Sequence, residues 1–171
     1  MFSNTSISPE DLPSVEFLEY QPLHPEYRQI MILRVLVFNA VLLVGLILYV
    51  AFNGVALHWI GVIGISFLLL VGVQILIAYR NFAYKGYAIR EHDLVYTSGW
   101  LFRKWTAISF NRIQHSEVSQ GLIERMFDLS TLEVFTAGGS SSDLKIGGLP
   151  DKTAHQLRDF ITKKIARDEE E

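Results

Sequence analysis

Few residues of this chain have the types and spacing that catalysis requires. The five histidines stand apart, and the 171-residue sequence contains no cysteine. Without cysteine, a structural zinc site would depend on histidine and carboxylate ligands alone. The sequence also has no phosphate-binding loop, dinucleotide fingerprint or His-Glu-x-x-His motif. We therefore expect no catalytic, cofactor-binding or metal-binding residues, and a protein that is not an enzyme.

The densest polar cluster of the sequence comprises Asn111, Arg112, Gln114 and His115. On a β-strand, Arg112 and Gln114 would share one face, with Asn111 and His115 on the other. One interpretation is a strip that binds a partner or faces lipid. The other, which we favour, is structural: Asn111 and Arg112 build a turn and pair with carboxylates such as Glu117 or Glu133, because a barrel corner needs satisfied polar groups.

A second cluster places two cations between two aromatic side chains, at Phe102, Arg103, Lys104 and Trp105. On a hairpin tip, the rings can enter a membrane interface while each cation gains about 1 kcal/mol from anionic headgroups. Residues 80–127 carry a net charge of +3 (seven basic, four acidic), whereas residues 128–171 carry −3 (six basic, nine acidic). Specific polyphosphate recognition is not expected, because the first predicted turn, residues 91–93, is Glu-His-Asp.

Both clusters follow a long apolar segment. Between Arg34 and Arg80 lie 45 residues without Asp, Glu, Lys or Arg. A helix needs about 20 apolar residues to cross a bilayer, so this run suffices for two crossings, at about residues 30–52 and 59–79, joined at Asn53-Gly54. A helical hairpin buried in a soluble protein is disfavoured, because so small a domain has no shell to cover it.

The placement of lysine and arginine predicts the orientation of this hairpin. Its connecting turn, residues 53–58, has no cation, whereas its outer ends carry Arg28, Arg34, Arg80, Lys85 and Arg90. Cationic flanks remain in the cytoplasm. We therefore expect a multi-pass protein of the cytoplasmic (inner) membrane with both termini in the cytoplasm.

Two amides, Asn39 and Gln74, interrupt the apolar run. In antiparallel helices they would lie about a turn apart in depth, so we expect an interhelical hydrogen bond worth about 0.6 kcal/mol, or contacts with a second membrane protein. Glycines at 45, 61, 64 and 72 are expected to allow close helix approach. A transport path is disfavoured, because two helices cannot enclose a pore.

After residue 79, β-branched and aromatic residues alternate with turn signals every eight to twelve positions, which predicts a small antiparallel sheet system. The predicted strands cover about residues 87–90, 94–102, 105–110, 113–119, 132–137 and 144–146. A helical turn is expected at 123–127, a hairpin turn at 138–140, and the end of the sheet at Gly147-Gly148. From Asp151, apolar residues recur every three or four positions, as in an amphipathic helix.

The predicted fold class is an α+β membrane protein: a two-helix transmembrane hairpin followed by a small PH-like antiparallel β-barrel capped by a C-terminal α-helix. The expected segments are a polar acidic N-terminal segment (1–29), the hairpin (30–79), a cytoplasmic PH-like domain (80–167) and an acidic tail (168–171).

Several short motifs carry a family resemblance: Ser98-Gly99-Trp100-Leu101, Asn111-Arg112-Ile113-Gln114-His115, Gln120-Gly121-Leu122, Glu124-Arg125-Met126-Phe127 and Gly148-Leu149-Pro150. Together they resemble the bacterial PH-domain membrane proteins of the YdbS-like group, over about residues 20–167. The resemblance implies a PH-like fold beside a membrane hairpin. It also implies partnership with a larger membrane protein that carries several such domains.

Three functions remain open from the sequence. The favoured one is a non-catalytic interaction or scaffold subunit of a membrane protein complex, in contact with lipids and with another membrane protein. The alternative is a subunit that senses anionic lipid headgroups or handles lipid. An enzyme or transporter component is the least favoured. Nucleic acid is not expected as a partner, because the pI is near 5.9 and no basic stripe is present.

Overall fold

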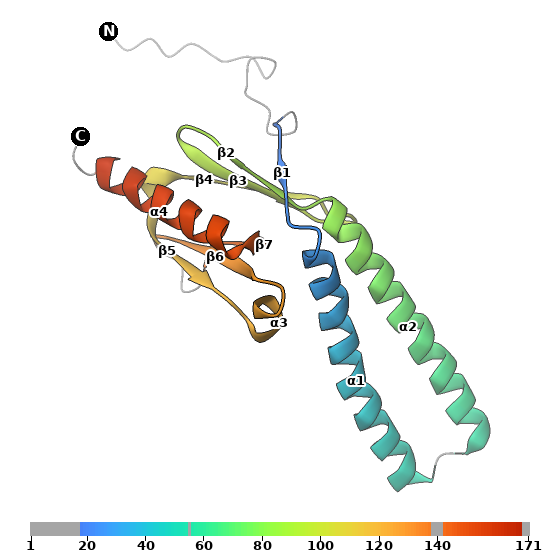
Figure 1. Ribbon diagram of the computed structural model, residues 1–171. Coiled ribbons are helices and arrows are strands. Elements are labelled where there is room, and N and C mark those ends of the chain that lie inside the picture. The colour runs from blue at the N-terminus through green and yellow to red at the C-terminus, as the bar shows by residue number, and fades with distance from the viewer. Residues whose placement is uncertain (1–17, 55, 138–141, 169–171) are drawn as a thin grey trace.

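The computed structural model describes residues 18–54, 56–137 and 142–168. Figure 1 shows two long helices that extend side by side from one end of a body made of β-sheets and one further helix. The chain passes through the helices first and then builds the body, except for a short strand before the first helix.

The two long helices are α1 (Tyr27–Asn53) and α2 (Leu57–Ala83), and each is long and apolar enough to cross a membrane. Both extend beyond the predicted apolar spans. The turn between them uses Gly54, whose φ of 60° lies in the left-handed region that glycine tolerates best. Almost none of either apolar stretch is buried within the chain, so the hairpin needs an apolar environment.

The glycines of the hairpin do not bring its helices together. A Cβ atom added at any of four positions would meet nothing within 4 Å: Gly45, Gly61, Gly64 and Gly72. The expectation that these residues allow close helix approach within the chain is therefore wrong. Gly64 lines an apolar pocket formed by residues of both helices, so the helices stand apart at this position.

The first sheet has the order β1-β2-β3-β4 and is antiparallel throughout. Its strands are β1 (Gln21–Pro22), β2 (Gly86–Ile89), β3 (Asp93–Ser98) and β4 (Lys104–Ser109). Strand β1 was not expected, because it comes from the polar segment before the hairpin. Strand β3 ends at Ser98 rather than continuing to residue 102, since Gly99 has a φ of 96° and starts the turn into β4.

The second sheet has the order β5-β6-β7. A 3-10 turn, η3 (Phe110–Arg112), leads into β5 (Ile113–Ser119), and the helical turn α3 (Leu122–Arg125) leads into β6 (Leu129–Thr136). Strand β7 (Leu144–Pro150) runs through Gly147-Gly148, which were expected to end the sheet. The predicted hairpin turn at 138–140 lies outside the described residues.

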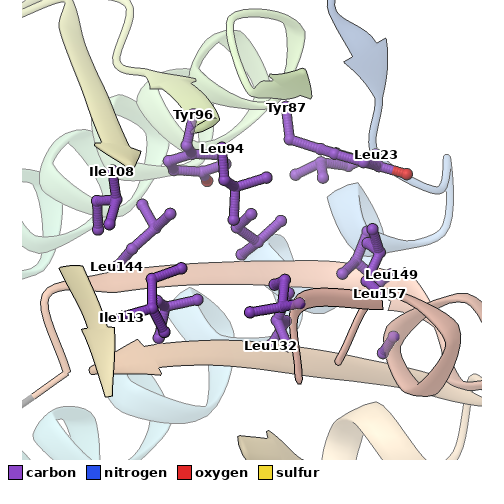
Figure 2. Packing of buried hydrophobic residues seen from close by; sticks show 14 of the residues in the cluster. Leu23, Tyr87, Leu94, Tyr96, Ile108, Ile113, Leu132, Leu144, Leu149 and Leu157 are labelled. Carbon is purple, nitrogen blue, oxygen red and sulfur yellow. The ribbon is translucent and has the colours of Figure 1, made fainter. Parts of the chain in front are cut away.

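The core lies between the two sheets. Figure 2 shows Leu94 and Ile108 of the first sheet directed toward Ile113, Leu132 and Leu144 of the second. Helix α4 (Asp151–Asp168) packs against β5, β6 and η3, and its apolar stripe adds Ala154, Leu157 and Ile161 to the core. The predicted PH-like antiparallel β-structure with a C-terminal helix is confirmed. Its strands form two sheets, and the body made of both sheets and α4 is called the barrel below.

Candidate functional site at the junction of hairpin and barrel

The first turns of α1 belong to the barrel core. Tyr27 and Ile30 are 6% and 0% exposed and pack in the same cluster as the strand residues. Tyr27 lies over Gly147 and Gly148, where an added Cβ would collide with the tyrosine ring or hydroxyl. The backbone N–H of His24 also donates to the carbonyl of Gly148 at 3.0 Å. The lack of side chains at this glycine pair in β7 therefore leaves the space that Tyr27, at the start of α1, occupies.

A buried carboxylate joins the next turns of α1 to the barrel. The side chain of Glu124 in α3 is only 5% exposed. Its Oε1 accepts hydrogen bonds from Arg34 Nη2 at 2.8 Å and Thr131 Oγ1 at 3.0 Å, and its Oε2 accepts from the Gly121 N–H at 2.9 Å. A buried charge is tolerated when it is paired and hydrogen-bonded in this way. Arg34 thereby holds α3 against α1.

A polar cavity of about 510 Å³ lies next to this ion pair. Its lining comes from α1, α3, β3, β5, β6, β7 and the connection between α2 and β2. Its charged residues are Arg34, Lys85, Glu124, Glu133 and Lys145. Lys145 pairs with Glu133 at 2.7 Å, and this hydrogen bond lowers the pKa of the Glu133 carboxyl. With Arg34 paired to Glu124, one cation remains.

That cation is Lys85, in the two-residue connection between α2 and β2. Its Nζ lies 5.4 Å from the centroid of the Tyr27 ring. No carboxylate within residues 18–54, 56–137 and 142–168 forms an ion pair with it. Burial, and secondarily the charge of Arg34, lower the pKa of Lys85. An anion in the cavity would oppose this lowering of the Lys85 pKa by electrostatic attraction.

The turn between β3 and β4 lies against the end of α2. The backbone N–H of Trp100 donates to Asn81 Oδ1 at 2.8 Å. Two cation–π contacts reinforce this attachment: Arg80 over the Trp100 ring at 5.5 Å and Arg103 over the Tyr84 ring at 5.2 Å. The turn is thus fixed to the helix that precedes it by about 20 residues.

The predicted lipid-surface cluster occupies this turn and the start of β4. Phe102, Arg103 and Lys104 are exposed, and Trp105 is half-buried. Arg103 and Trp105 line a second cavity of about 480 Å³, together with Tyr84 and Lys85. Lys85 therefore lies between two cavities that both open at the junction.

The predicted interaction cluster lies at a different corner of the barrel. Asn111 and Arg112 are in η3, and Gln114 lies where a bulge shifts the pairing of β5 with β6. Strand alternation is therefore broken, and all four residues of the cluster are exposed. The expected faces are wrong for this reason. His115 stacks on Phe135, with centroids 4.3 Å apart.

The expected pairing of Arg112 with Glu117 or Glu133 is also wrong, because Glu133 binds Lys145 and Glu117 lies 3.7 Å from His115 Nε2. Among the described residues, Arg112 has no ion pair. Asn111 and Arg112 do build a turn, η3, as the structural interpretation expected, but the carboxylate pairing that it included is not present among the described residues. The use of the cluster as a contact surface stays a prediction.

The two amides of the hairpin contact each other. Asn39 Nδ2 donates to Gln74 Oε1 at 2.8 Å, and Asn39 is 3% exposed. The interhelical hydrogen bond expected from the sequence is present. It also fixes the register of the two antiparallel helices. Whether either amide contacts a second protein stays a prediction.

Sequence reasoning missed the junction. Arg34 was counted only among the cations at the ends of the hairpin and Glu124 only as part of a motif, because their contact spans 90 residues. The Gly147-Gly148 pair was the available signal, since adjacent glycines inside a strand indicate a close approach of other atoms. No three His, Asp or Glu side chains come together as a metal site in the part of the chain that the structure describes.

Two apolar helices and a PH-like barrel that share one core define a membrane protein with a PH-like domain. The chain belongs to the bacterial PH domain family, whose model matches residues 33–165. It is 28% identical over 147 residues to the UPF0699 transmembrane protein YdbS of Bacillus subtilis (strain 168), covering 82% of this chain and 89% of that protein.

The chain is also 29% identical over 106 residues to the UPF0699 transmembrane protein YdbT of the same organism. That match covers 61% of this chain but only 21% of YdbT. The chain therefore spans most of one relative and about a fifth of the other. No solved structure matches it.

Proposed function

We propose that this chain is a membrane-anchored, non-catalytic interaction subunit that presents a PH-like barrel to another membrane protein. One observation carries the proposal: Tyr27 and Ile30 of α1 are part of the barrel core. The barrel cannot swing freely on a linker when the membrane helix itself completes its interior. A domain held at a fixed position near the bilayer meets other membrane proteins at a raised effective concentration, so weak contacts suffice.

The proposal includes a topology in which α1 and α2 both cross the membrane and both termini lie in the cytoplasm. The cations at the outer ends of the hairpin, against none in residues 53–58, support it. A reporter that is active only in the cytoplasm, fused after Glu171, is expected to be active. An expressed but inactive fusion would contradict the topology.

The partner that we propose is a longer membrane protein with several PH-like domains. Support comes from the two relatives, one matched over 89% of its length and the other over 21%, because the family then includes a short and a much longer form. Two contact surfaces are proposed: the exposed cluster Asn111, Arg112, Gln114 and His115 on the barrel, and the pair Asn39 and Gln74 between the helices.

The test uses the full chain, tagged and extracted from its native membranes in mild detergent, with native mass measurement and identification of co-purifying proteins. A second membrane protein at fixed stoichiometry is expected. Arg112→Ala with Gln114→Ala is expected to reduce its recovery, while Glu91→Ala, at the exposed β2–β3 turn, should not. A monomer from gentle extraction, with no other protein bound, would contradict an interaction subunit.

A replacement of both Asn39 and Gln74 by Leu distinguishes the two surfaces. If the complex is lost while the variant still inserts and folds, the amides contact the partner. If the complex persists, the amides serve packing within the hairpin, and the contact lies on the barrel.

Binding of an anionic lipid headgroup is the second candidate function, and Lys85 favours it. This cation lies between two cavities without a carboxylate partner in the described residues. Native mass spectrometry of the full chain with phosphatidylglycerol should show fewer bound lipids for Lys85→Gln than for Lys152→Gln, an exposed control on α4. Equal lipid counts would exclude Lys85 from headgroup binding.

A further inference from the structure

We infer that the barrel rests on the membrane interface at two points, one attached to each helix of the hairpin. The first is the outer face of α3, with Leu122 and Met126. The second is the turn between β3 and β4, with Leu101 and Phe102. The inference builds on the proposed membrane topology and adds how the barrel is oriented against the bilayer.

Exposed apolar side chains of the barrel are concentrated at these two points. Outside α1 and α2, the described residues include five exposed large hydrophobic side chains, and four of them are Leu101, Phe102, Leu122 and Met126. Their exposed fractions are 60%, 88%, 88% and 77%, against 40% for the fifth, Phe160 of α4. Met126 directly follows α3 with helical backbone angles and is four residues after Leu122, so the two side chains lie on the same side of this helical turn.

Each point is attached to a different apolar helix. The Arg34–Glu124 hydrogen bond holds α3 against α1, and the Trp100–Asn81 hydrogen bond holds the turn against α2. Both attachments are direct and short, at 2.8 Å each. The apolar groups therefore cannot move far from the surface of the hairpin.

The two attachments lie near the same end of the hairpin. The Asn39–Gln74 hydrogen bond pairs the antiparallel helices. Arg34 is five residues before Asn39 and Asn81 is seven residues after Gln74, so both attachments lie on the same side of this hydrogen bond, about 8 and 11 Å from it along the helix axes. Both points thus lie at the end of the hairpin that carries the barrel.

The predicted membrane interface lies at this end of the hairpin. Tyr79 ends the second predicted span, Arg34 and Arg80 flank the uncharged run, and aromatic and cationic side chains concentrate at membrane–water boundaries. Exposed cations accompany the apolar groups at both points, Arg125 on α3 and Arg103 with Lys104 at the turn. Apolar side chains beside cations match the boundary between acyl chains and anionic headgroups. The occupant of both points is therefore the bilayer that holds α1 and α2.

The absence of cysteine from the sequence permits a direct test with single labels. Met126→Cys and Phe102→Cys, each in the full chain, carry an environment-sensitive fluorophore after reconstitution into vesicles of phosphatidylethanolamine and phosphatidylglycerol. Glu91→Cys, in the exposed β2–β3 turn, is the water-facing control. Leu69→Cys, 66% exposed on α2, is the lipid-facing control. Quenching by lipids spin-labelled near the headgroup or deep in the acyl chain measures depth.

Labels at positions 126 and 102 are expected to emit at shorter wavelength than the label at 91, and to be quenched several-fold more strongly by the shallow quencher. The label at 69 should respond more to the deep quencher. If the label at position 69 is quenched while the labels at 126 and 102 show the emission and quenching of the label at 91, the inference is wrong and the topology stands. If 69 is not quenched either, the topology itself fails. A blue shift at 126 without lipid quenching would indicate that protein covers α3, which also overturns the inference.

Discussion

Arg34 Nη2 donates a 2.8 Å hydrogen bond to Glu124 Oε1, and this contact joins an apolar helix to the barrel across 90 residues of sequence. The two partners differ in burial, because the Glu124 side chain is 5% exposed and the Arg34 side chain is 49% exposed. The carboxylate is therefore the buried member and depends on the pair. The arginine can return to water if the pair is broken.

Removal of the arginine should cost more than loss of a surface ion pair. Arg34→Met leaves a buried carboxylate with two neutral hydrogen-bond donors and no charge partner, and breaking a fully buried pair costs about 3–5 kcal/mol. The half-exposed arginine makes this an upper bound, so we expect a loss of about 1–3 kcal/mol. Denaturant or thermal unfolding of the full chain in detergent measures it, with Arg112→Met as the exposed control.

The same pair should show coupling in a double-mutant cycle. Glu124→Gln alone leaves an amide opposite the Gly121 N–H and is also expected to destabilise the barrel. In the combined variant no buried charge remains, so the total loss should be smaller than the sum of the single losses by about 0.5–3 kcal/mol. Additive losses would show that the ion pair contributes nothing to the attachment of α3.

Gly148→Ala should detach the start of α1 from β7. The added Cβ would collide with the Tyr27 ring, and the φ of 77° at this position is strained for alanine. We expect a loss of stability of several kcal/mol, or failure to fold. Gly64→Ala in α2, where a Cβ meets nothing within 4 Å, is the matched control. A melting temperature equal to that of the control would contradict the packing of Tyr27 on Gly148.

Leu157→Ala should weaken the attachment of α4. Leu157 is 6% exposed in the core, and truncation of a buried leucine typically costs about 2–5 kcal/mol. The measurement belongs in the full chain rather than in a fragment starting at residue 86, because Leu23, Tyr27 and Ile30 complete the same core. An exposed α4 change, Lys152→Ala, should leave the melt unchanged. If Leu157→Ala also leaves the melting temperature unchanged, the described register of α4 is wrong.

Because of Lys85, the stability of the protein should change with pH in the alkaline range. Burial lowers its pKa below the ordinary 10.5, so between the folded pKa and 10.5 the unfolded chain binds more protons and stability rises with pH. Below this pH window the free-energy cost of burying the charged Lys85 side chain is fully present. Lys85→Met should therefore raise the melting temperature. The gain should shrink as pH approaches 10.5. Melts of both proteins from pH 7 to 10 check this, and a pH-independent difference would contradict it.

The sequence by itself determined the elements and their classes. A run of 45 uncharged residues is a property of composition, and it predicts two apolar helices without any tertiary contact. The amphipathic stripe of α4, with Leu157 and Ile161 in the core, was likewise visible from spacing alone. Local periodicity reflects which face is buried, so it predicts elements well.

Only the tertiary structure decided how the hairpin and the barrel meet. In the sequence, Glu124 is an ordinary helix residue. Only the folded chain brings Arg34, Thr131 and Gly121 to its carboxylate as hydrogen-bond donors. Strand β1 has two residues and depends on pairing with β2, so no local pattern predicts it. Gly147 and Gly148 remain within a strand because Tyr27 occupies the space that side chains would need. Contacts between residues distant in sequence carry no periodic signal, and the junction consists almost entirely of such contacts.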